Sequence, residues 1–115
     1  MPHLSLRIYL DPEGRIGPGK IELLEKIASL GSIAAAGRAM GMSYRRAWEL
    51  VEDLNRTLGV PVVITSAGGS GGGGATLTLA GEAVVAHYRA IEAATAAAAK
   101  KHVAALANLS GPAPD

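Results

Sequence analysis

The sequence contains no cysteine and no phenylalanine, and its only aromatic residues are one tryptophan and three tyrosines among 115 residues. Without cysteine the chain forms neither disulfides nor thiolate metal sites, which fits the reducing environment of the cytoplasm. With so few aromatic rings, its core must consist mainly of aliphatic side chains. No apolar run approaches the roughly 18 residues that span a bilayer, and the N-terminus does not have the pattern of a secretory signal. We therefore expect a cytoplasmic protein with no membrane partner.

Net charge is also small, with eleven basic residues against ten acidic ones. Its distribution is uneven, because residues 15–46 hold six basic groups and two acidic ones, whereas residues 61–81 hold no charge. A local positive excess attracts polyanions such as DNA. This excess is modest, so a single copy of the chain is expected to bind DNA weakly.

Residues 31–59 carry the pattern around which the chain is organised. Ser32 is suited to cap a short helix of small residues, and Ser43 is suited to cap a longer one, with Gly41 in the turn between them. The alanines and the glycine of residues 34–39 keep the first helix thin, so that another helix can cross it closely. These features predict a helix-turn-helix whose second helix reads DNA.

The second helix of this unit separates apolar from charged residues. Ala47, Val51 and Leu54 share one face when residues are placed about 100° apart, while Arg45 lies opposite and Arg46 lies on the flank. Both arginines fall in the first turn, where a helix entering the major groove meets base edges, and a guanidinium matches the two acceptors of guanine or a phosphate. Acidic residues further along would repel phosphate. A solvated face of mixed charge explains the helix alone equally well.

A glycine-rich run follows this helix. Residues 62–64 and 76–79 predict two short strands, and the run SAGGSGGGGA over residues 66–75 connects them. Strands joined in this way after a helix-turn-helix form a wing, whose backbone amides approach phosphate closely because glycine has no side chain. A loop without function is the competing interpretation. A nucleotide-binding loop is disfavoured, since the lysine and Ser/Thr of that motif are missing.

Both ends of the chain contain elements without an obvious partner. The alternation from Leu4 to Leu10 predicts a strand that must pair within its own chain or with a second copy. Residues 80–108 predict a helix roughly 40 Å long, which exceeds the width of a small domain. A second copy is the natural cover for its apolar stripe, and a solvated tail is the alternative. The predicted homodimer interface comprises Leu6, Ile8, Val84, Tyr88, Ile91, Ala94, Ala98 and Ala105.

The sequence gives little support for metal binding or catalysis. His3, His87 and His102 lie far apart without metal-ligand spacing, and no serine has a nearby base in the sequence. We therefore expect neither an enzyme, nor a metal site, nor a cofactor. The predicted fold class is a mostly helical α+β domain, a winged helix-turn-helix with an N-terminal strand and a long C-terminal dimerisation helix. It should occupy residues 1–110, followed by a disordered tail over residues 111–115.

Three sequence segments together resemble a known family. They are GSI at residues 31–33, MSYRRAWELVEDLN at residues 42–55 and GGSGGGGATLTLAGEAVVAHY at residues 68–88. The combination is similar to the N-terminal DNA-binding domain of the molybdate-responsive ModE regulators, a winged helix-turn-helix related to the LysR type. The resemblance covers about residues 18–92. In the family, molybdate is bound by further C-terminal domains that residues 1–115 do not include, which leaves ligand sensing open.

The resemblance implies a dimer that binds double-stranded DNA at a palindromic operator and a link to molybdate homeostasis. Family wings often hold a basic residue where this sequence has Ser70, which implies a weaker wing contact. The alternative function is a small adaptor or anion-sensing module that binds protein partners through the same helices. The candidate DNA contacts are Ser32, Arg38, Ser43, Tyr44, Arg45, Arg46, Ser70, Gly71, Gly72, Gly73 and Gly74.

Overall fold

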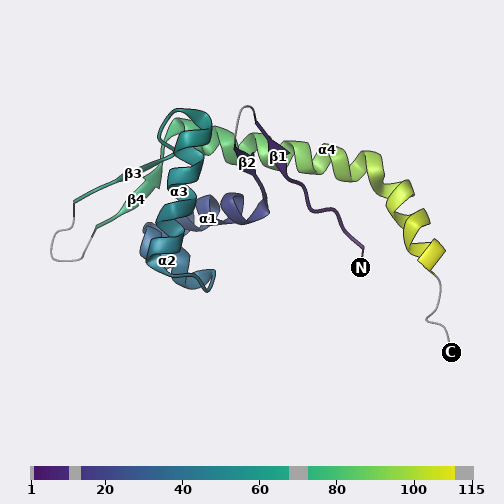
Figure 1. The fold of residues 1–115 in the computed structure, drawn as a ribbon, viewed down its shortest axis with the longest axis horizontal. Helices are drawn as coiled ribbons and strands as arrows, with labels where there is room; N and C mark the ends of the chain where they lie inside the picture. Colours follow the sequence, from purple (N-terminus) through teal and green to yellow (C-terminus); the bar gives the residue numbers. More distant parts are fainter. Residues whose placement is uncertain (1, 11–13, 68–72, 111–115) are drawn as a thin grey trace.

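The computed structural model describes residues 2–10, 14–67 and 73–110. The described residues up to about residue 90 form a mostly helical head, and the rest of one long helix projects from it (Figure 1). The predicted tail over residues 111–115 lies outside the described residues. The mostly helical α+β fold class is confirmed. The elements are β1 (Ile8–Tyr9), β2 (Arg15–Ile16), α1 (Pro18–Leu30), α2 (Ile33–Ala39), α3 (Tyr44–Leu58), β3 (Val63–Thr65), β4 (Ala75–Leu77) and α4 (Leu79–Ser110).

The starts of α2 and α3, and the turn between these two helices, follow from the local sequence. The Ser32 hydroxyl accepts a hydrogen bond from the Ala35 amide at 2.9 Å, and the Ser43 hydroxyl accepts one from the Arg46 amide at 3.0 Å. Each bond satisfies one of the free amides at a helix N-terminus. Gly41 in the turn has a φ of 69°, a left-handed conformation that glycine adopts without strain. The two predicted caps and the glycine turn are confirmed.

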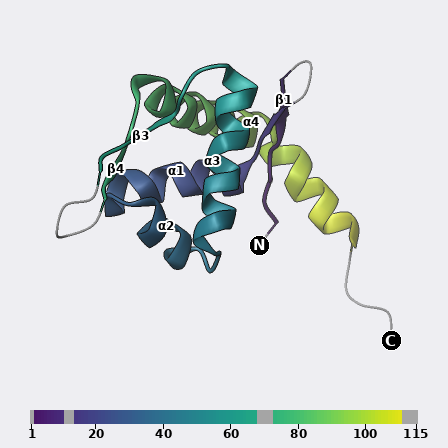
Figure 2. The same ribbon diagram turned by 60° about the vertical axis from the view of Figure 1, so that its left-hand side comes forward.

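Helix α1 lies at the centre of the head, where α2, α3, α4 and the wing strand β4 surround it (Figure 2). Leu23, Leu24 and Ile27 of α1 are completely buried, as is Leu54 of α3. Helices α2 and α3 cross closely, because a Cβ at Gly37 would lie only 3.3 Å from the Ala47 Cβ. Small residues on α2 therefore permit the tight crossing that the sequence predicted, and this crossing fixes the direction of α3.

The N-terminal strand finds its partner in its own chain. β1 pairs antiparallel with β2, with Ile8 opposite Ile16 and Tyr9 opposite Arg15. The strand is shorter than the alternation from Leu4 to Leu10 suggested, because β2 offers only two residues to pair with. Ile8 is half-buried against the core of the head. The alternative of a strand exchanged between copies is therefore not needed for pairing.

Helix α4 has two different halves. Its first turns pack on α1 and β4, and Gly81 lies so close to Val62 that an added Cβ would collide with the Val62 carbonyl oxygen. Beyond about residue 90 the helix projects away from the head, which gives the molecule dimensions of 61 × 33 × 22 Å (Figure 1). Leu106 and Leu109 in this part are 66% and 81% exposed. The second half of α4 therefore has no cover among the described residues.

Candidate nucleic-acid interface

The N-terminus of α3 presents the predicted reading residues to solvent. Tyr44 is 57% exposed, and the side chains of Arg45 and Arg46 are 91% and 55% exposed. Both arginines form ion pairs with Glu49, through Arg45 Nε at 3.5 Å and Arg46 Nη1 at 3.3 Å. Exposed pairs of this kind contribute at most about 1 kcal/mol. Either guanidinium can therefore leave Glu49 for a stronger phosphate or base partner.

Helices α2 and α3 and the wing meet around one hollow. It has a volume of about 320 Å³, and Ser32, Tyr44, Thr65, Ser66 and Gly73 are among the residues that line it. The Tyr44 ring is held at its edge by Trp48, with centroids 6.3 Å apart and planes at 78°. The fold thus brings together three of the predicted contact segments, which are separated by up to about 40 residues in the sequence.

The wing is a two-stranded antiparallel hairpin, as predicted. Val63 pairs with Leu77 and Thr65 with Ala75. At the loop end of the strands the Ser66 amide donates to the Gly74 carbonyl at 2.9 Å, and the Ala75 amide donates to the Gly31 carbonyl at 2.8 Å. The second bond ties the wing to the corner between α1 and α2. Gly73 is exposed and Gly74 is half-buried, whereas the predicted contacts Ser70, Gly71 and Gly72 lie outside the described residues.

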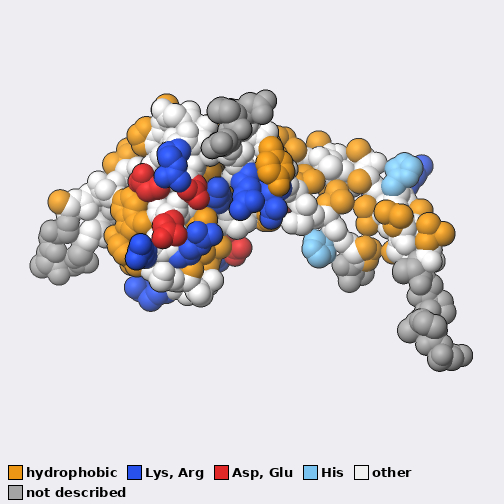
Figure 3. Space-filling view, in the orientation of Figure 1, with side chains coloured by type: hydrophobic (Ala, Val, Ile, Leu, Met, Phe, Trp, Pro, Cys, Tyr) orange, Lys and Arg blue, Asp and Glu red, His pale blue; other side chains and the backbone are white. Residues whose placement is uncertain are grey.

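The remaining DNA candidates occupy the ends of their helices. Arg38 is exposed in the last turn of α2, and Ser32 begins the same helix. The hydroxyl oxygens of Ser32 and Ser43 both accept a backbone amide, so the hydroxyl hydrogens stay free to donate to a phosphate. Figure 3 shows acidic and basic side chains mixed over this face of the head rather than one uniformly positive surface.

The predicted dimer residues separate into two groups. Leu6, Ile8 and Val84 are half-buried against the core of the head, whereas Ile91, Ala94, Ala98 and Ala105 are exposed on α4. Tyr88 is only 2% exposed, and its hydroxyl donates to the Leu6 carbonyl at 2.7 Å. The Tyr88 ring thus packs inside its own chain, and its place in a dimer interface stays a prediction.

An apolar hollow of about 250 Å³ opens beside this stripe, between the N-terminal hairpin, the end of α3 and α4. Its lining includes Ile8, Leu10, Leu58, Val84 and Ile91. Leu10 and Ile91 are 37% and 44% exposed. The apolar surface of α4 therefore continues onto the hairpin, so that the two form one surface.

Sequence reasoning missed the contact that sets the direction of α4. Arg89 donates to both carboxylate oxygens of Glu25 on α1, at 2.6 and 3.2 Å, and to Glu92 at 2.7 Å. These hydrogen bonds lower the pKa of the Glu25 carboxyl, against the opposing effect of burial. A fork of two parallel bonds fixes orientation as well as distance. Because the partners are 64 residues apart, no local sequence pattern predicts the pair.

Residues 19–82 match the family of bacterial regulatory helix-turn-helix proteins of the LysR type. The chain belongs to this family. Among the described residues, no helix is long and apolar enough to cross a bilayer, and no group of three metal-ligating side chains is found.

Relatives of this LysR-type chain include the molybdenum-pterin-binding protein MopB of Rhodobacter capsulatus, 49% identical over 82 residues, which are 71% of this chain and 30% of MopB. The molybdenum transport protein ModE of Azotobacter vinelandii is 37% identical over 73 residues, 64% of this chain and 27% of ModE. The chain thus spans less than a third of either relative. These matches confirm the resemblance to the N-terminal domain of ModE regulators.

The fold is similar to that in the crystal structure of a CbnR_DBD–DNA complex. The TM-score is 0.57 and the identity 24%, and the match covers 76% of this chain and 95% of that chain. The winged helix-turn-helix arrangement of α1, α2, α3 and the two wing strands is therefore shared with a solved structure.

Proposed function

We propose that this chain is the DNA-binding part of a dimeric transcriptional regulator, which reads a palindromic operator with α3. The proposal depends mainly on the hollow where the exposed first turn of α3, the start of α2 and the loop end of the wing strands meet. A DNA strand lying along this hollow would contact all three segments at once. Membership of a regulatory family supports the same function.

In this proposal only the first turn of α3 enters the major groove. Arg45, whose side chain is 91% exposed, reads a base edge, and Arg46 contacts the backbone from the flank. The acidic residues Glu49 and Glu52 follow on the same helix and are exposed, so they would repel phosphates if α3 lay lengthwise in the groove. Tyr44 and Ser43 are placed to donate hydrogen bonds to phosphate oxygens. Ser32, Arg38 and the wing glycines supply further backbone contacts.

The dimer is proposed to form through the exposed half of α4. Its stripe of small side chains permits close approach of a second α4, and the adjoining apolar hollow extends the surface onto the hairpin. Non-specific binding by one module is typically only about 10⁻⁴–10⁻⁶ M. Two linked modules gain affinity because the second contact is effectively intramolecular, and they require half-sites about one helical turn apart.

A role in molybdenum-dependent regulation is proposed from the relatives, whose names refer to molybdenum-pterin binding and molybdenum transport. The proposal includes no catalytic activity, because the family is a regulatory one. The competing function is an adaptor that binds a protein through the same helices. Salt dependence separates the two, since phosphate contacts make log affinity fall linearly with log salt, whereas an apolar protein interface responds weakly.

The deciding experiment begins with fragments of genomic DNA captured by the full chain and sequenced. A duplex carrying the recovered motif is then titrated against a scrambled duplex at several salt concentrations. We expect binding of the motif to be roughly 10³-fold or more tighter than binding of the scrambled duplex, with a linear salt dependence. Equal affinity for the two duplexes would contradict the proposed reading of sequence.

The roles of the two arginines in the first turn of α3 can be separated by substitution. Arg45→Ala is expected to cost about 1–3 kcal/mol of specific binding and to relax the preference at one base position, because a bidentate base contact is lost. Arg46→Ala serves as the matched control and should weaken binding to all duplexes alike, with a salt slope smaller by about one. If Arg45→Ala also weakened all sequences equally, Arg45 would be a backbone contact.

A further inference from the structure

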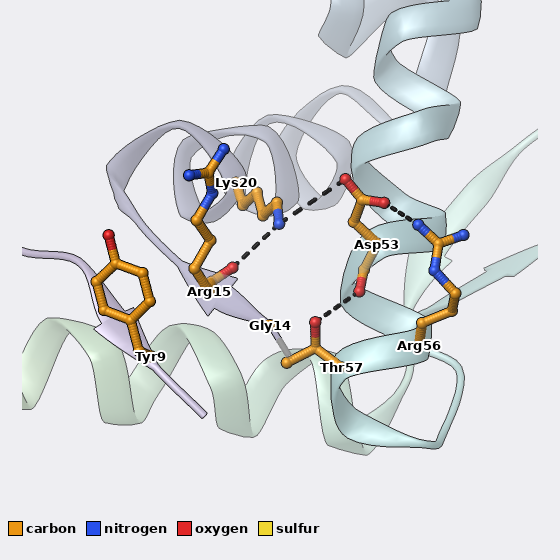
Figure 4. Close-up of a pocket in the computed structure, with 7 residues that line it drawn as sticks. All are labelled: Tyr9, Gly14, Arg15, Lys20, Asp53, Arg56 and Thr57. Carbon is orange, nitrogen blue, oxygen red and sulfur yellow. Dashed lines mark hydrogen bonds and ion pairs between the residues drawn. The ribbon is translucent and has the colours of Figure 1, made fainter. Parts of the chain in front are cut away.

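A charged hollow lies away from the wing. It has a volume of about 340 Å³ and opens between the N-terminal hairpin, the first turn of α1 and the second half of α3 (Figure 4). Arg15, Lys20 and Arg56 line it together with one carboxylate, Asp53, and the phenol of Tyr9. Three cations from three separate elements therefore surround one space, with a single acidic group among the lining residues that the structure describes.

Asp53, the carboxylate among the described lining residues, already interacts with two of the three cations. Arg56 forms an ion pair with one oxygen of Asp53, and the Lys20 ammonium lies 4.0 Å from the other. Lys20 also donates to the Arg15 backbone carbonyl at 3.0 Å, which holds its head group at the hollow. Arg15 has no carboxylate partner within the part of the chain that the structure describes. Among the described residues that line it, the hollow therefore keeps an excess of two positive charges.

The environment of Lys20 reflects this excess. Its side chain is only 13% exposed, and its pKa is lowered, chiefly by burial and further by repulsion from Arg15, Arg46 and Arg56. The attraction of Asp53 offsets these effects only in part. An anion in the hollow would neutralise the repulsion among the cations. We therefore expect an anion to bind here with a more favourable electrostatic free energy than at a set of isolated surface charges.

This hollow adjoins the reading end of α3. A neighbouring depression is lined by three arginines and three carboxylates, namely Arg45, Arg46, Arg56, Glu49, Glu52 and Asp53, and the two depressions share Asp53 and Arg56. Figure 3 shows basic side chains on this face with acidic ones between them. Arg46 and Arg56 are ten residues apart, about 15 Å along the helix axis, which corresponds to about four base pairs of DNA.

We propose that this hollow binds a phosphate group, with Arg15, Lys20 and Arg56 as its ligands and the Tyr9 hydroxyl as a further donor. Guanidinium groups match phosphate oxygens in pairs, and the lysine adds a point charge. The phosphate belongs either to the DNA backbone beside the half-site or to a free phosphate ion. The first source rests on the proposed function, whereas the second does not depend on it.

The DNA source is tested in the full chain by Arg15→Gln, an exposed position, and by Lys20→Gln as a second variant. Lys100→Gln on the distal part of α4 removes the same charge and serves as the control. Arg15→Gln and Lys20→Gln are each expected to reduce the slope of log affinity against log salt for operator binding by about one, while leaving the base preference unchanged. The control should keep the slope of the wild type.

The free-ion source is tested without DNA by titrating inorganic phosphate and following the NMR signals of Tyr9, Arg15 and Lys20. Saturable shifts that Arg15→Gln abolishes, together with unchanged salt slopes, would assign the hollow to a free anion. Reduced salt slopes with no saturable shift would assign it to the DNA backbone. Unchanged slopes and no saturable shift overturn the proposal. A wild type that binds no DNA refutes the proposed function, while the phosphate titration still tests the hollow.

Discussion

A chain of residues 1–115 carrying both Ala94→Glu and Ala98→Glu is expected to be a monomer that binds a palindromic operator roughly 10²–10⁴-fold more weakly than the wild type. Both alanines are exposed in the protomer, so the substitutions should leave the head folded. If the stripe is covered by a second copy, each copy would bury two carboxylates against an apolar surface, and burying unpaired charge is costly. Sedimentation and a gel-shift titration measure the two effects.

The control pair is Ala93→Glu with Ala96→Glu, which adds the same charge to the same part of α4. At about 100° per residue these positions point away from Ala94 and Ala98, and both are exposed. The control protein should remain a dimer with nearly unchanged operator affinity. A wild type that sediments as a monomer at micromolar concentration, yet binds the palindrome tightly, would contradict the proposed dimer. Equal damage from both pairs would indicate a general effect of acidic charge.

Local signals in the sequence predicted the helix-turn-helix well. A cap such as Ser32 or Ser43 bonds to an amide three residues later, so the information needed lies within one helical turn. The same holds for the left-handed glycine in the turn between α2 and α3. The wing was predictable because its two strands are consecutive and a glycine run joins them. Local signals are therefore enough to predict that Tyr44, Arg45 and Arg46 lie in the first turn of α3.

Contacts between distant segments were not predictable in this way. The strand pairing of Ile8 and Tyr9 depends on two residues of β2, which are too few to show an alternating pattern. The bidentate pair of Arg89 with Glu25 joins helices 64 residues apart in sequence. The charged hollow was missed for the same reason. Arg15 and Lys20 counted toward the basic region, but only the fold places them opposite Asp53 and Arg56.

Tyr88 shows where helical periodicity reaches its limit. The sequence shows that α4 has an apolar side, but it does not distinguish a side chain packed on the same protomer from one awaiting a second copy. The structure makes the distinction, because Tyr88 is almost fully buried in the head while Ile91, one turn later, is 44% exposed. The first turns of α4 thus belong to the protomer core, and the proposed interface begins near residue 91.

Tyr88→Ala is accordingly expected to lower the free energy of unfolding by about 3–5 kcal/mol, the usual cost of removing a large ring from a packed core. Tyr88→Phe keeps the ring and removes only the hydroxyl that donates to the Leu6 carbonyl at 2.7 Å. Its expected cost is about 1 kcal/mol, because the half-buried carbonyl loses its partner. Urea unfolding followed by circular dichroism measures both variants.

These measurements are best made in the Ala94→Glu, Ala98→Glu background, because the stability of a dimer depends on protein concentration and would mix association with folding. In a monomer, truncating a core side chain lowers the free energy of unfolding, whereas truncating an interface side chain leaves it nearly unchanged. If Tyr88 packs in the head, Tyr88→Ala destabilises the monomer strongly and Tyr88→Phe does so weakly. An unfolding free energy unchanged by Tyr88→Ala would mean that the ring stabilises only the dimer, which its burial against its own chain argues against.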